Sequence, residues 1–542
     1  MIVIVIVIFA LVTTLFAAWR AWRRLRYFLH IFQLEGYKPD EFVRWIRHRA
    51  GRILFRLSHK LAVAELVVGF FGFFYWSPYW TAVILLPLWS ITFASSRLYR
   101  SDQQKKPLTY TNRLQRLLAA AAMMAALPVV LSFIYWTTTG IENLFYYLLG
   151  FFAADLLAPL WVLLAAHLIK PVETSIQEGF KRRARRRLRS RPDVKIIGIT
   201  GSYGKTSTKF IIDEILRQRY NVLASPASYN TPMGLCIVVN EMMKPEHQVL
   251  VLEMGIRHHG DMHELCAIAH PDVAVVTSVG MAHLETMGSI EAITREKSQI
   301  LTCMERGGVA ILNADDPRVN SMESSTSGKV WKVSAKGSIE ADITAHNISY
   351  GPEGAQFTVR DDTGDERTFK TKLLGEHNVL NILLGVAVGR ELDVRLRQIA
   401  YAVERLEPIE HRLQLRQQGQ ITIIDDAFNS NPVGARNALE ILGRFNSGRR
   451  IVITPGMIEL GDHQYEENKR LGEHIADHVD LALLVGGEQT RPIQDGLKAK
   501  HFPAEKWKVL GSFFEAQNFL RTYLQPGDVV LYENDLPDQY NE

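Results

Sequence analysis

The sequence predicts a multi-pass α-helical membrane domain followed by two α/β domains, and three observations support this fold class. Long apolar runs fall almost entirely within the first 170 of the 542 residues. Residues 196–210, IIGITGSYGKTSTKF, have the pattern of a strand, a glycine-containing loop and a helix. Beyond residue 195, short β-branched runs alternate with helical stretches, which indicates parallel sheets flanked by helices.

Charge is distributed unevenly along the chain. Residues 1–195 carry 27 Lys and Arg against 10 Asp and Glu, a net charge of +17, whereas the remaining residues carry a net charge of −12. The basic balance therefore belongs to the segment that holds the apolar runs. A nucleic-acid-binding function for the whole chain loses its main support.

Five apolar runs predict membrane-spanning helices, because about 20 apolar residues cross a ~30 Å hydrocarbon core. Met1–Trp19 lacks a basic n-region and the charges follow it, which argues against a cleaved signal peptide. Leu61–Trp76 and Tyr79–Ala94 predict a tight helical hairpin around Ser77 and Pro78. Both runs are short, so a re-entrant pair or one long tilted helix is an alternative. The clearer runs are Leu117–Trp136 and Leu144–Ile169.

The basic residues predict the orientation of this membrane domain. Arg20–Lys60 contains eleven basic residues, Ser95–Arg116 six and Lys170–Lys195 ten, whereas the two short connections between the runs contain none. The positive-inside rule therefore places the N-terminus outside the cell membrane and everything after Lys170 in the cytoplasm.

Two charged features of the membrane domain have candidate roles. Lys181–Arg191, KRRARRRLRSR, follows the last predicted span and is expected to contact anionic membrane lipids, with a nuclear or nucleic-acid-binding signal as the alternative. Asp155 is the lone acid within that span, which makes it a functional candidate. A hydrogen bond from Asp155 to a neighbouring helix that only fixes packing is the alternative.

The loop after residue 199 is typical of a phosphate-binding loop. Such a loop needs glycines that let backbone N–H groups approach phosphate oxygens, a lysine, a hydroxyl for magnesium and a helix N-terminus behind them. The usual spacing would place a first glycine at position 199, which is Ile199, so the form here is TGxxGKT. A turn that binds nothing would leave the Lys-Thr pair unexplained. The predicted ATP-binding residues of this loop are Gly201, Ser202, Tyr203, Gly204, Lys205, Thr206 and Ser207.

Polar side chains follow the predicted strands at the edge where parallel sheets bind ligands. Glu253 ends the strand Val249–Glu253, where an acid beside a phosphate loop can hold magnesium. His283 follows the next strand, and a structural hydrogen-bonding role is its alternative. Lys297 lies in the helical stretch Ser289–Leu301, which by its pattern alone would be a solvated helix face.

Nine ordered sequence blocks between residues 196 and about 530 resemble the Mur ligase family. The resemblance covers roughly two-thirds of the chain and places these blocks in the family's order. The blocks are TGSYGKTS, EMG, TSVGMAHLETMGS, TREKSQI, LNADDP, LLGEHNVLN, EHRLQ, IDDAFNSNP and TPGMIELGD.

The resemblance implies an ATP-dependent, ADP-forming amide ligase of cell-wall precursor synthesis. Such a ligase activates a substrate carboxylate as an acyl phosphate and couples it to an amine, such as D-alanyl-D-alanine or another amino acid or dipeptide. ATP and Mg²⁺ are the implied cofactors. Thr206 and Glu253 match the first magnesium site, and His283 and Lys297 match the second, with Lys297 as a carbamate. Lys205, Lys297 and His283 are the implied catalytic residues.

Further residues match family positions that contact the nucleotide or that help to close the C-terminal domain. Asn378 and Asn381 match the adenine-side motif, and Arg412 and Asp426 match residues that reach the nucleotide from the C-terminal domain. Asn429 and Asn431 belong to FNSNP, which matches a block that helps to close that domain on the ligand. Turn chemistry is the alternative for these asparagines.

The apolar runs and the resemblance together predict three domains and leave the substrate open. We expect residues 1–190 to form the membrane domain, 195–406 the central ATP-binding domain, with a β-richer stretch at Ala341–Lys372, and 408–542 the C-terminal, doubly wound domain. Family members begin with a soluble UDP-binding domain, whose place the membrane domain takes here. The chain also ends GDVVLYENDLPDQYNE, where members that add D-alanyl-D-alanine have a glycine- and arginine-rich segment.

These departures suggest an alternative acceptor, a lipid-linked muropeptide or another membrane-borne carboxylate, in place of a small UDP-linked one. The expected partners are this acceptor, an amine donor, anionic membrane lipids and other cell-wall biosynthesis proteins, with no nucleic acid. Alternatives of another class are an ATP-driven transporter and a catalytically idle scaffold.

Overall fold

The computed structural model describes residues 1–53, 57–94, 107–227, 229–351, 354–428, 430–446 and 448–535, with the side chains of 48–53 left out. The chain forms two compact units, one of Met1–Ile176 and one that begins at Gln177. Each unit has its own buried apolar clusters, as expected for parts that each bury a core.

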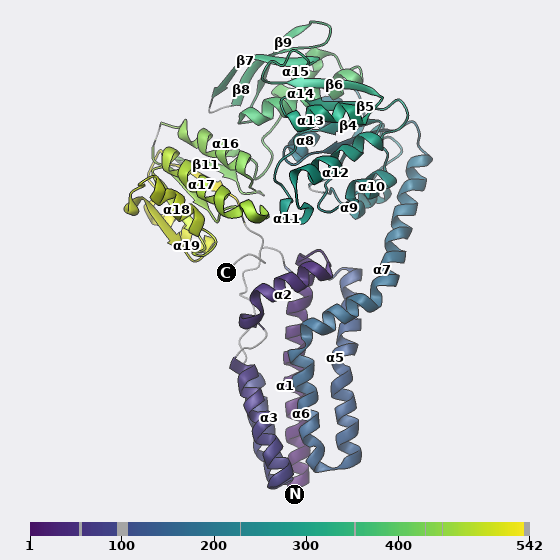
Figure 1. The fold of residues 1–542 in the computed structure, drawn as a ribbon, viewed down its shortest axis with the longest axis vertical. Helices are drawn as coiled ribbons and strands as arrows, with labels where there is room; N and C mark the ends of the chain where they lie inside the picture. Colours follow the sequence, from purple (N-terminus) through teal and green to yellow (C-terminus); the bar gives the residue numbers. More distant parts are fainter. Residues whose placement is uncertain are drawn as a thin grey trace. The chain divides into compact units, whose positions relative to one another are not determined.

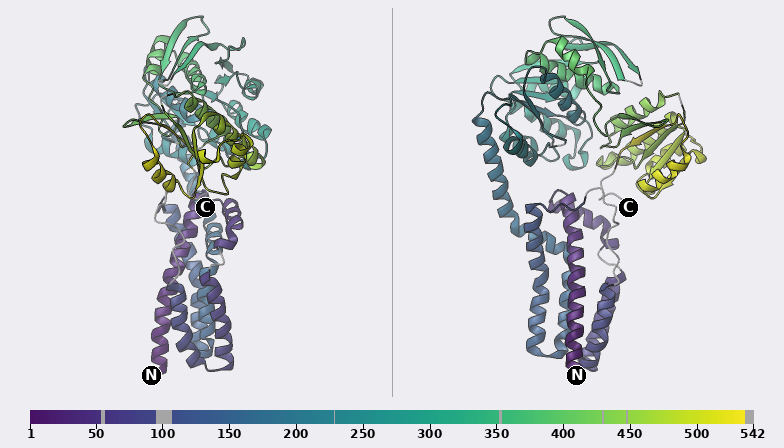
Figure 2. Two further views of the ribbon diagram at one scale, coloured as in Figure 1. Left: turned by 90° about the vertical axis from the view of Figure 1, so that its left-hand side faces the viewer. Right: turned by 180° about the vertical axis from the view of Figure 1, so that it is seen from behind.

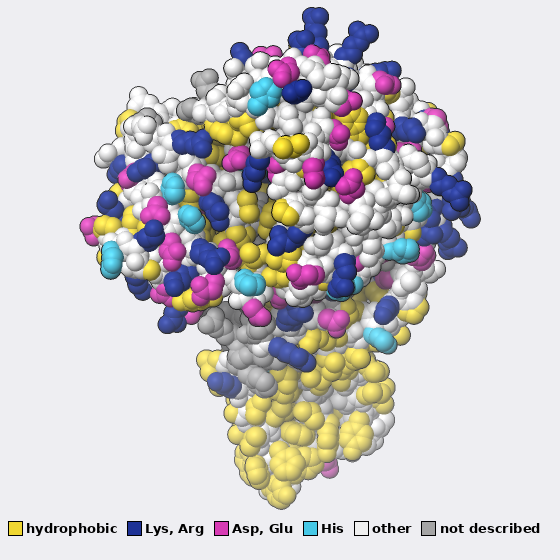
Figure 3. All heavy atoms as spheres, turned by 45° about the horizontal axis from the view of Figure 1, so that its top comes forward, with side chains coloured by type: hydrophobic (Ala, Val, Ile, Leu, Met, Phe, Trp, Pro, Cys, Tyr) yellow, Lys and Arg dark blue, Asp and Glu magenta, His cyan; other side chains and the backbone are white. Residues whose placement is uncertain are grey.

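The first unit is a bundle of helices, which Figures 1 and 2 show running alongside one another. Its surface carries large exposed apolar side chains, among them Ile4, Leu15, Phe71 and Leu131, and Figure 3 shows the apolar surface that such side chains make. The helices are α1 (Ile2–Leu34), α2 (Pro39–Ile53), α3 (Leu57–Tyr75), α4 (Pro78–Ala94), α5 (Asn112–Thr139), α6 (Leu144–Leu156) and the first part of α7 (Ala158–Arg189).

All five predicted apolar runs are helical, but they differ in length and continuity. Among the described residues, three helices are long and apolar enough to cross a membrane, namely α1, α3 and α5, and a bent pair, α6 with α7, would make a fourth. The run Leu144–Ile169, predicted as one span, is not one continuous helix, since these two helices meet at 70°. Pro159, at the second position of α7, lacks an N–H donor and disfavours helix before it. The fifth run, α4, has 17 residues.

The hairpin predicted around Ser77 and Pro78 is present. A Cβ added at Gly72 would meet Thr81 at 2.6 Å, and one added at Gly69 would meet Leu85 at 2.9 Å. The paired residue numbers run in opposite directions, so α3 and α4 pack antiparallel along their length. Small residues at such a contact let two helix backbones approach closely.

Charged side chains are more deeply buried in this bundle than the sequence suggested. Arg20 and Asp155, each 1% exposed, form an ion pair of 2.9 Å between α1 and α6. His59 Nε2 also lies 2.9 Å from Asp155 Oδ2. Arg20 was expected in the loop after the first span, but α1 continues to Leu34. Asp155 therefore has buried partners on two other helices, in agreement with the packing alternative.

The basic segment at the end of α7 packs partly against protein. Arg187 donates to the carbonyl oxygens of Asn240, at 2.7 Å, and of Met243. Ala184 is fully buried, and Lys181 forms an ion pair of 2.6 Å with Glu264. This part of α7 therefore belongs to the second unit, and some of its positive charge is already engaged.

A nine-stranded sheet forms the core of the first part of the second unit (Figure 1). Its order is β2-β3-β1-β4-β5-β6-β7-β8-β9, parallel up to β7 and antiparallel from β7 to β9. The parallel sheet expected from the alternating pattern is therefore present, and the antiparallel strands β7–β9 extend it into a mixed sheet. The strands are β1 (Lys195–Thr200), β2 (Val222–Ala224), β3 (Val249–Glu253), β4 (Val273–Val276), β5 (Val309–Asn313), β6 (Lys329–Ser334), β7 (Ile343–Gly351), β8 (Gly354–Arg360) and β9 (Glu366–Thr371).

Helices cover both faces of this sheet because alternate strand residues are apolar on both sides. Ile197 and Ile199 of β1 pack with one set of helices, and Leu250 and Leu252 of β3 pack with the other. The first set is α8 (Lys205–Leu216), α14 (Glu376–Glu391) and α15 (Leu396–Glu404), and the second includes α9 (Pro232–Ile237), α10 (Asp261–Ile268) and α12 (Ile290–Thr302).

A second, six-stranded sheet follows, with the order β10-β11-β15-β12-β13-β14. Only β10 is antiparallel to its neighbour. The strands are β10 (Gln414–Gln418), β11 (Ile421–Asp426), β12 (Arg450–Thr454), β13 (Leu481–Val485), β14 (Trp507–Leu510) and β15 (Val529–Glu533). Its helices are α16 (Pro432–Gly443), α17 (Gln464–His478), α18 (Arg491–Ala499) and α19 (Phe513–Tyr523).

Candidate active site

The predicted phosphate loop lies between β1 and α8. Gly201 has a φ of +151° and Gly204 a φ of +81°, a region that residues with a Cβ rarely adopt. A Cβ at Gly201 would lie 1.9 Å from Thr277 Oγ1, and one at Gly204 would lie 2.6 Å from Asn381 Oδ1. Both glycines are therefore required by the loop's conformation and by its close neighbours.

The loop is held against the segment that follows β4. Ser202 N donates to Ser278 O at 2.7 Å, and Tyr203 N donates to Ser278 Oγ at 3.2 Å. Lys205 Nζ donates to Gly201 O at 2.6 Å. Burial lowers the pKa of Lys205, because it disfavours the charged ammonium. Phosphate oxygens bound at the helix N-terminus would stabilise that charge.

Glu253, at the end of β3, is held by three side chains. Thr206 Oγ1 donates to Glu253 Oε2 at 3.0 Å, and Asn230 Nδ2 donates to Oε1 at 3.1 Å. Lys209 Nζ lies 3.7 Å from Oε2 and donates to Ala227 O at 2.5 Å. Our sequence analysis missed Asn230 and Lys209, because nothing in their local pattern points to Glu253.

Lys297 is buried, so the solvated-helix alternative for this residue is wrong. Its side chain on α12 is 2% exposed, and burial, followed by the nearby charge of Lys205, holds its pKa well below the usual range. A neutral amine is the form that can react with carbon dioxide to give a carbamate. The environment of Lys297 is therefore suited to the carbamate that the resemblance implies.

His283 lies after β4 with a φ of +64°. Its Nδ1 is 3.3 Å from Glu459 Oε2, and Glu459 also forms a 2.9 Å ion pair with Arg257. Burial lowers the pKa of His283 and favours the neutral imidazole, the form that binds metals. Glu459 is a further residue at this site that was not singled out from the sequence.

Asn378 and Asn381 lie side by side on α14 and next to the phosphate loop. Asn381 Nδ2 donates to Asn378 Oδ1 at 3.1 Å, and Thr208 Oγ1 donates to Asn381 Oδ1 at 3.2 Å. Both asparagines are buried. The structure therefore brings the predicted adenine-side pair to the first turns of α8.

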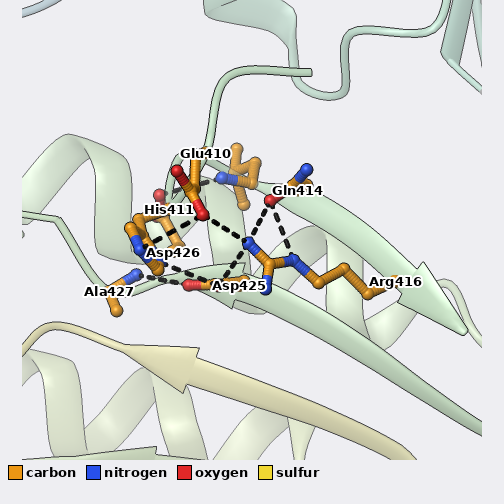
Figure 4. Close-up of polar contacts among 8 residues, drawn as sticks. Glu410, His411, Gln414, Arg416, Asp425, Asp426 and Ala427 are labelled. Carbon is orange, nitrogen blue, oxygen red and sulfur yellow. Dashed lines mark hydrogen bonds and ion pairs between the residues drawn. The ribbon is translucent and has the colours of Figure 1, made fainter. Parts of the chain in front are cut away.

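Arg412 lies in the loop before β10, and its side chain reaches the phosphate loop. Its Nη2 donates to Thr206 Oγ1 at 3.3 Å. The flanking residues His411 and Leu413 have φ values of +60° and +48°, so the backbone around Arg412 is strained. Polar contacts hold this segment to β11, as Figure 4 shows, with His411 Nδ1 2.9 Å from Asp425 Oδ2.

The remaining predicted residues lie along β11 and the loop after it. Leu413 N donates to Asp426 Oδ1 at 3.1 Å. Asn431 caps α16 by accepting a hydrogen bond of 2.9 Å from Gly434 N, in agreement with the turn-chemistry alternative. Asn429 lies outside the described residues.

The donor groups at this site fit magnesium better than a softer metal. Among the described residues, no group of three or more His, Cys, Asp and Glu side chains could hold a metal ion by itself. Thr206 and Glu253 instead offer a hydroxyl and a carboxylate beside the phosphate loop. Magnesium prefers such oxygen ligands and is bound by few protein groups together with substrate phosphates. When bound, it would neutralise charge on the transferring phosphate.

Comparison with known proteins agrees with this geometry. The chain matches the Mur ligase middle domain over residues 199–389 and the glutamate ligase domain of Mur ligases over residues 411–532. It is 33% identical, over 366 residues, to the UDP-N-acetylmuramoyl-tripeptide–D-alanyl-D-alanine ligase of Mycobacterium leprae, covering 62% of this chain and 70% of that protein. This chain belongs to the Mur ligase family.

Other relatives of this Mur ligase support the assignment. The enzyme of the same name from Bacillus subtilis is 29% identical and is matched over 72% of its length. The crystal structure of MurF from Acinetobacter baumannii has a TM-score of 0.60 at 27% identity, covering 67% of this chain and 78% of that one. MurF from Thermotoga maritima, solved with ADP, has a TM-score of 0.59 at 26% identity, covering 66% and 80%.

Family membership confirms the predicted reaction class. This Mur ligase is an ATP-dependent, ADP-forming enzyme that makes carbon–nitrogen bonds, with ATP and Mg²⁺ as predicted. The phosphate loop, Glu253, His283 and Lys297 all lie within the part of the chain that matches the middle domain.

Proposed function

We propose that this protein is a membrane-bound Mur ligase that couples D-alanyl-D-alanine to the peptide carboxylate of a muramoyl-peptide precursor of peptidoglycan. The observation that carries the proposal is the set of contacts joining Thr206, Asn230 and Lys209 to Glu253 beside the phosphate loop. The names of the relatives supply the substrate class.

The roles of individual residues are part of this proposal. The phosphate loop binds the ATP phosphates with Lys205, while Thr206 and Glu253 hold one Mg²⁺. His283 and carbamylated Lys297 hold a second. Two cations are needed because transfer of a phosphoryl group to a carboxylate brings two anions together. Asn378, Asn381, Arg412 and Asp426 bind the nucleotide, and Asn429 and Asn431 assist closure.

The membrane location rests on the first unit and its apolar surface. We propose that residues 1–190 form the membrane domain, with the N-terminus outside, and that the domains of residues 195–406 and 408–542 work in the cytoplasm. Arginines near the end of α7 that remain exposed, such as Arg182 and Arg186, can contact anionic lipids. A membrane-bound catalytic unit would suit a lipid-linked acceptor as well as a UDP-linked one.

Release of ADP by the detergent-purified full-length protein tests the proposal. The assay contains D-alanyl-D-alanine and either UDP-N-acetylmuramoyl-tripeptide or its lipid-linked counterpart. Turnover with the UDP-linked form alone would mean that the helices of the first unit only anchor the enzyme to the membrane. Turnover only with the lipid-linked form would assign acceptor recognition to the membrane domain. No turnover with either acceptor would contradict the proposed substrates.

Removal of residues 1–176 separates the ligase from the two alternatives of another class. The cut precedes Gln177, where the second unit begins, and keeps the docked end of α7. A ligase retains ATP binding after this removal, and it also retains ADP release with the UDP-linked acceptor if the full-length protein uses that acceptor. A transporter or idle scaffold would show no acceptor-dependent ADP release in either form.

A further inference from the structure

Two carboxylates lie next to each other at the carboxyl ends of β11 and β15. Asp426 and Glu533 are register partners on these parallel strands. Neighbouring strands are about 4.8 Å apart and register partners point to the same face, so the side chains are neighbours. Glu533 is 1% exposed, whereas Asp426 keeps some contact with water.

One carboxylate oxygen of this pair has no hydrogen-bond partner in the described part of the chain. Ser430 Oγ donates to Glu533 Oε1, while Glu533 Oε2 has no hydrogen-bond partner in the structure. Among the described residues, no Lys, Arg or His side chain forms an ion pair with Asp426 or Glu533. The positive charge of Arg412 acts on Asp426 but not on Glu533, so ionisation of both carboxylates requires a further cation beside Glu533.

The position of the pair connects it to the phosphate loop. Open α/β sheets bind ligands at the carboxyl ends of their strands. Leu413, whose N–H donates to Asp426, follows Arg412, whose guanidinium donates to Thr206. The proposed reaction brings one organic cation to this region, the ammonium group of the amine substrate.

We infer that Glu533, with Asp426 beside it, forms the subsite that receives the ammonium group of the amine substrate. The inference rests on the proposed ligase function. The unpaired Oε2 of Glu533 accepts a hydrogen bond from the ammonium, and Asp426 adds negative charge. Ser430 holds the Glu533 carboxylate in place. Asp426 keeps its proposed contact with the nucleotide, and Glu533 is the residue that this inference adds to the site.

A charge-neutral substitution tests the subsite in the full-length protein. Glu533→Gln keeps an oxygen that can accept from Ser430 but removes the charge. We expect the KM for D-alanyl-D-alanine to rise at least about tenfold, as for loss of a charge-assisted hydrogen bond, with the KM for ATP within about twofold. Glu533→Asp should restore part of the loss. Glu505→Gln, the same change at an exposed position, serves as the control.

Two kinetic results would overturn the inference. If the KM for the amine is unchanged in Glu533→Gln, the pair does not bind the amine and has only a structural role, with a proton shared between the two carboxyl groups. A change confined to the KM for ATP or the Mg²⁺ requirement would assign the pair to the nucleotide instead.

A binding measurement separates this inference from the proposed function, because it needs no turnover. Calorimetry compares D-alaninamide, a cation at neutral pH, with N-acetyl-D-alaninamide, which is neutral. Failure of the wild-type protein to use D-alanyl-D-alanine would contradict the proposed substrate, whereas a preference for the cationic probe that disappears in Glu533→Gln would still support the subsite. No preference in the wild-type protein, or the same preference in the variant, would overturn it.

Discussion

Replacing Asp426 with asparagine is expected to stabilise the protein, and more so at high pH than at low pH. Burial, with a contribution from Asp425, raises the pKa of Asp426 from 3.8 to about 7. Burial and the charge of Asp426 likewise raise the pKa of Glu533. Folding therefore disfavours the ionised carboxylate, and asparagine removes that ionisation while keeping an oxygen for Leu413 N.

The size and sign of the effect follow from proton linkage. Between about pH 4 and pH 7 the folded protein binds a proton at Asp426 that the unfolded chain has released, so the free energy of unfolding decreases as pH rises through this window. A shift of about three units corresponds to an upper limit of about 4 kcal/mol above pH 7 and to nothing below pH 4. Because Asp426 keeps some contact with water, we expect a gain of about 1–3 kcal/mol.

Urea unfolding of the wild-type protein and the variants, at several pH values from about 4.5 to 8.5, measures this gain. Asp425→Asn is the matched control on the same strand. It removes the negative charge that lies 2.9 Å from His411 Nδ1 and 3.5 Å from Arg416 Nη2, contacts that Figure 4 shows, and is expected to lower stability. A gain for Asp426→Asn that does not grow with pH would refute the reasoning that its ionised form is disfavoured in the folded protein.

Three substitutions test the phosphate and metal sites. Lys205→Ala is expected to abolish ADP release without loss of cooperative unfolding, and full activity would contradict the phosphate-loop assignment. Lys297→Ala should lower kcat at least about a hundredfold, with partial rescue by acetate or formate, whereas the exposed Arg295→Ala on the same helix should leave activity unchanged. Lys209→Met should raise the Mg²⁺ concentration needed for half-maximal ADP release about tenfold, since Lys209 helps to orient Glu253; an unchanged requirement would limit Lys209 to packing.

Local patterns predicted most of the second unit because its strands are short, β-branched and regularly spaced. The structure confirms β3 at its predicted bounds, Val249–Glu253. The antiparallel extension β7–β9 had been indicated only as a β-rich stretch, since an exposed edge of a sheet lacks the continuous apolar pattern of a buried strand.

Predictions for the first unit were less complete, because composition does not show where a helix bends or what its charges contact. The break before Pro159 divides a run that reads as one span. Arg20 reads as a loop residue after an apolar stretch, but in the helix it faces Asp155, more than a hundred residues away.

The sequence by itself determined the reaction class and the order of its parts, since the phosphate loop, the strand-end acid and the family blocks are local patterns whose spacing carries the chemistry. Tertiary structure alone decided which side chains act together. Asn230 and Lys209 reach Glu253, Lys297 is buried beside Lys205, and Asp426 lies opposite Glu533 only because sheet register and helix packing bring distant residues together. Burial and charge at such contacts depend on neighbours that no local pattern contains.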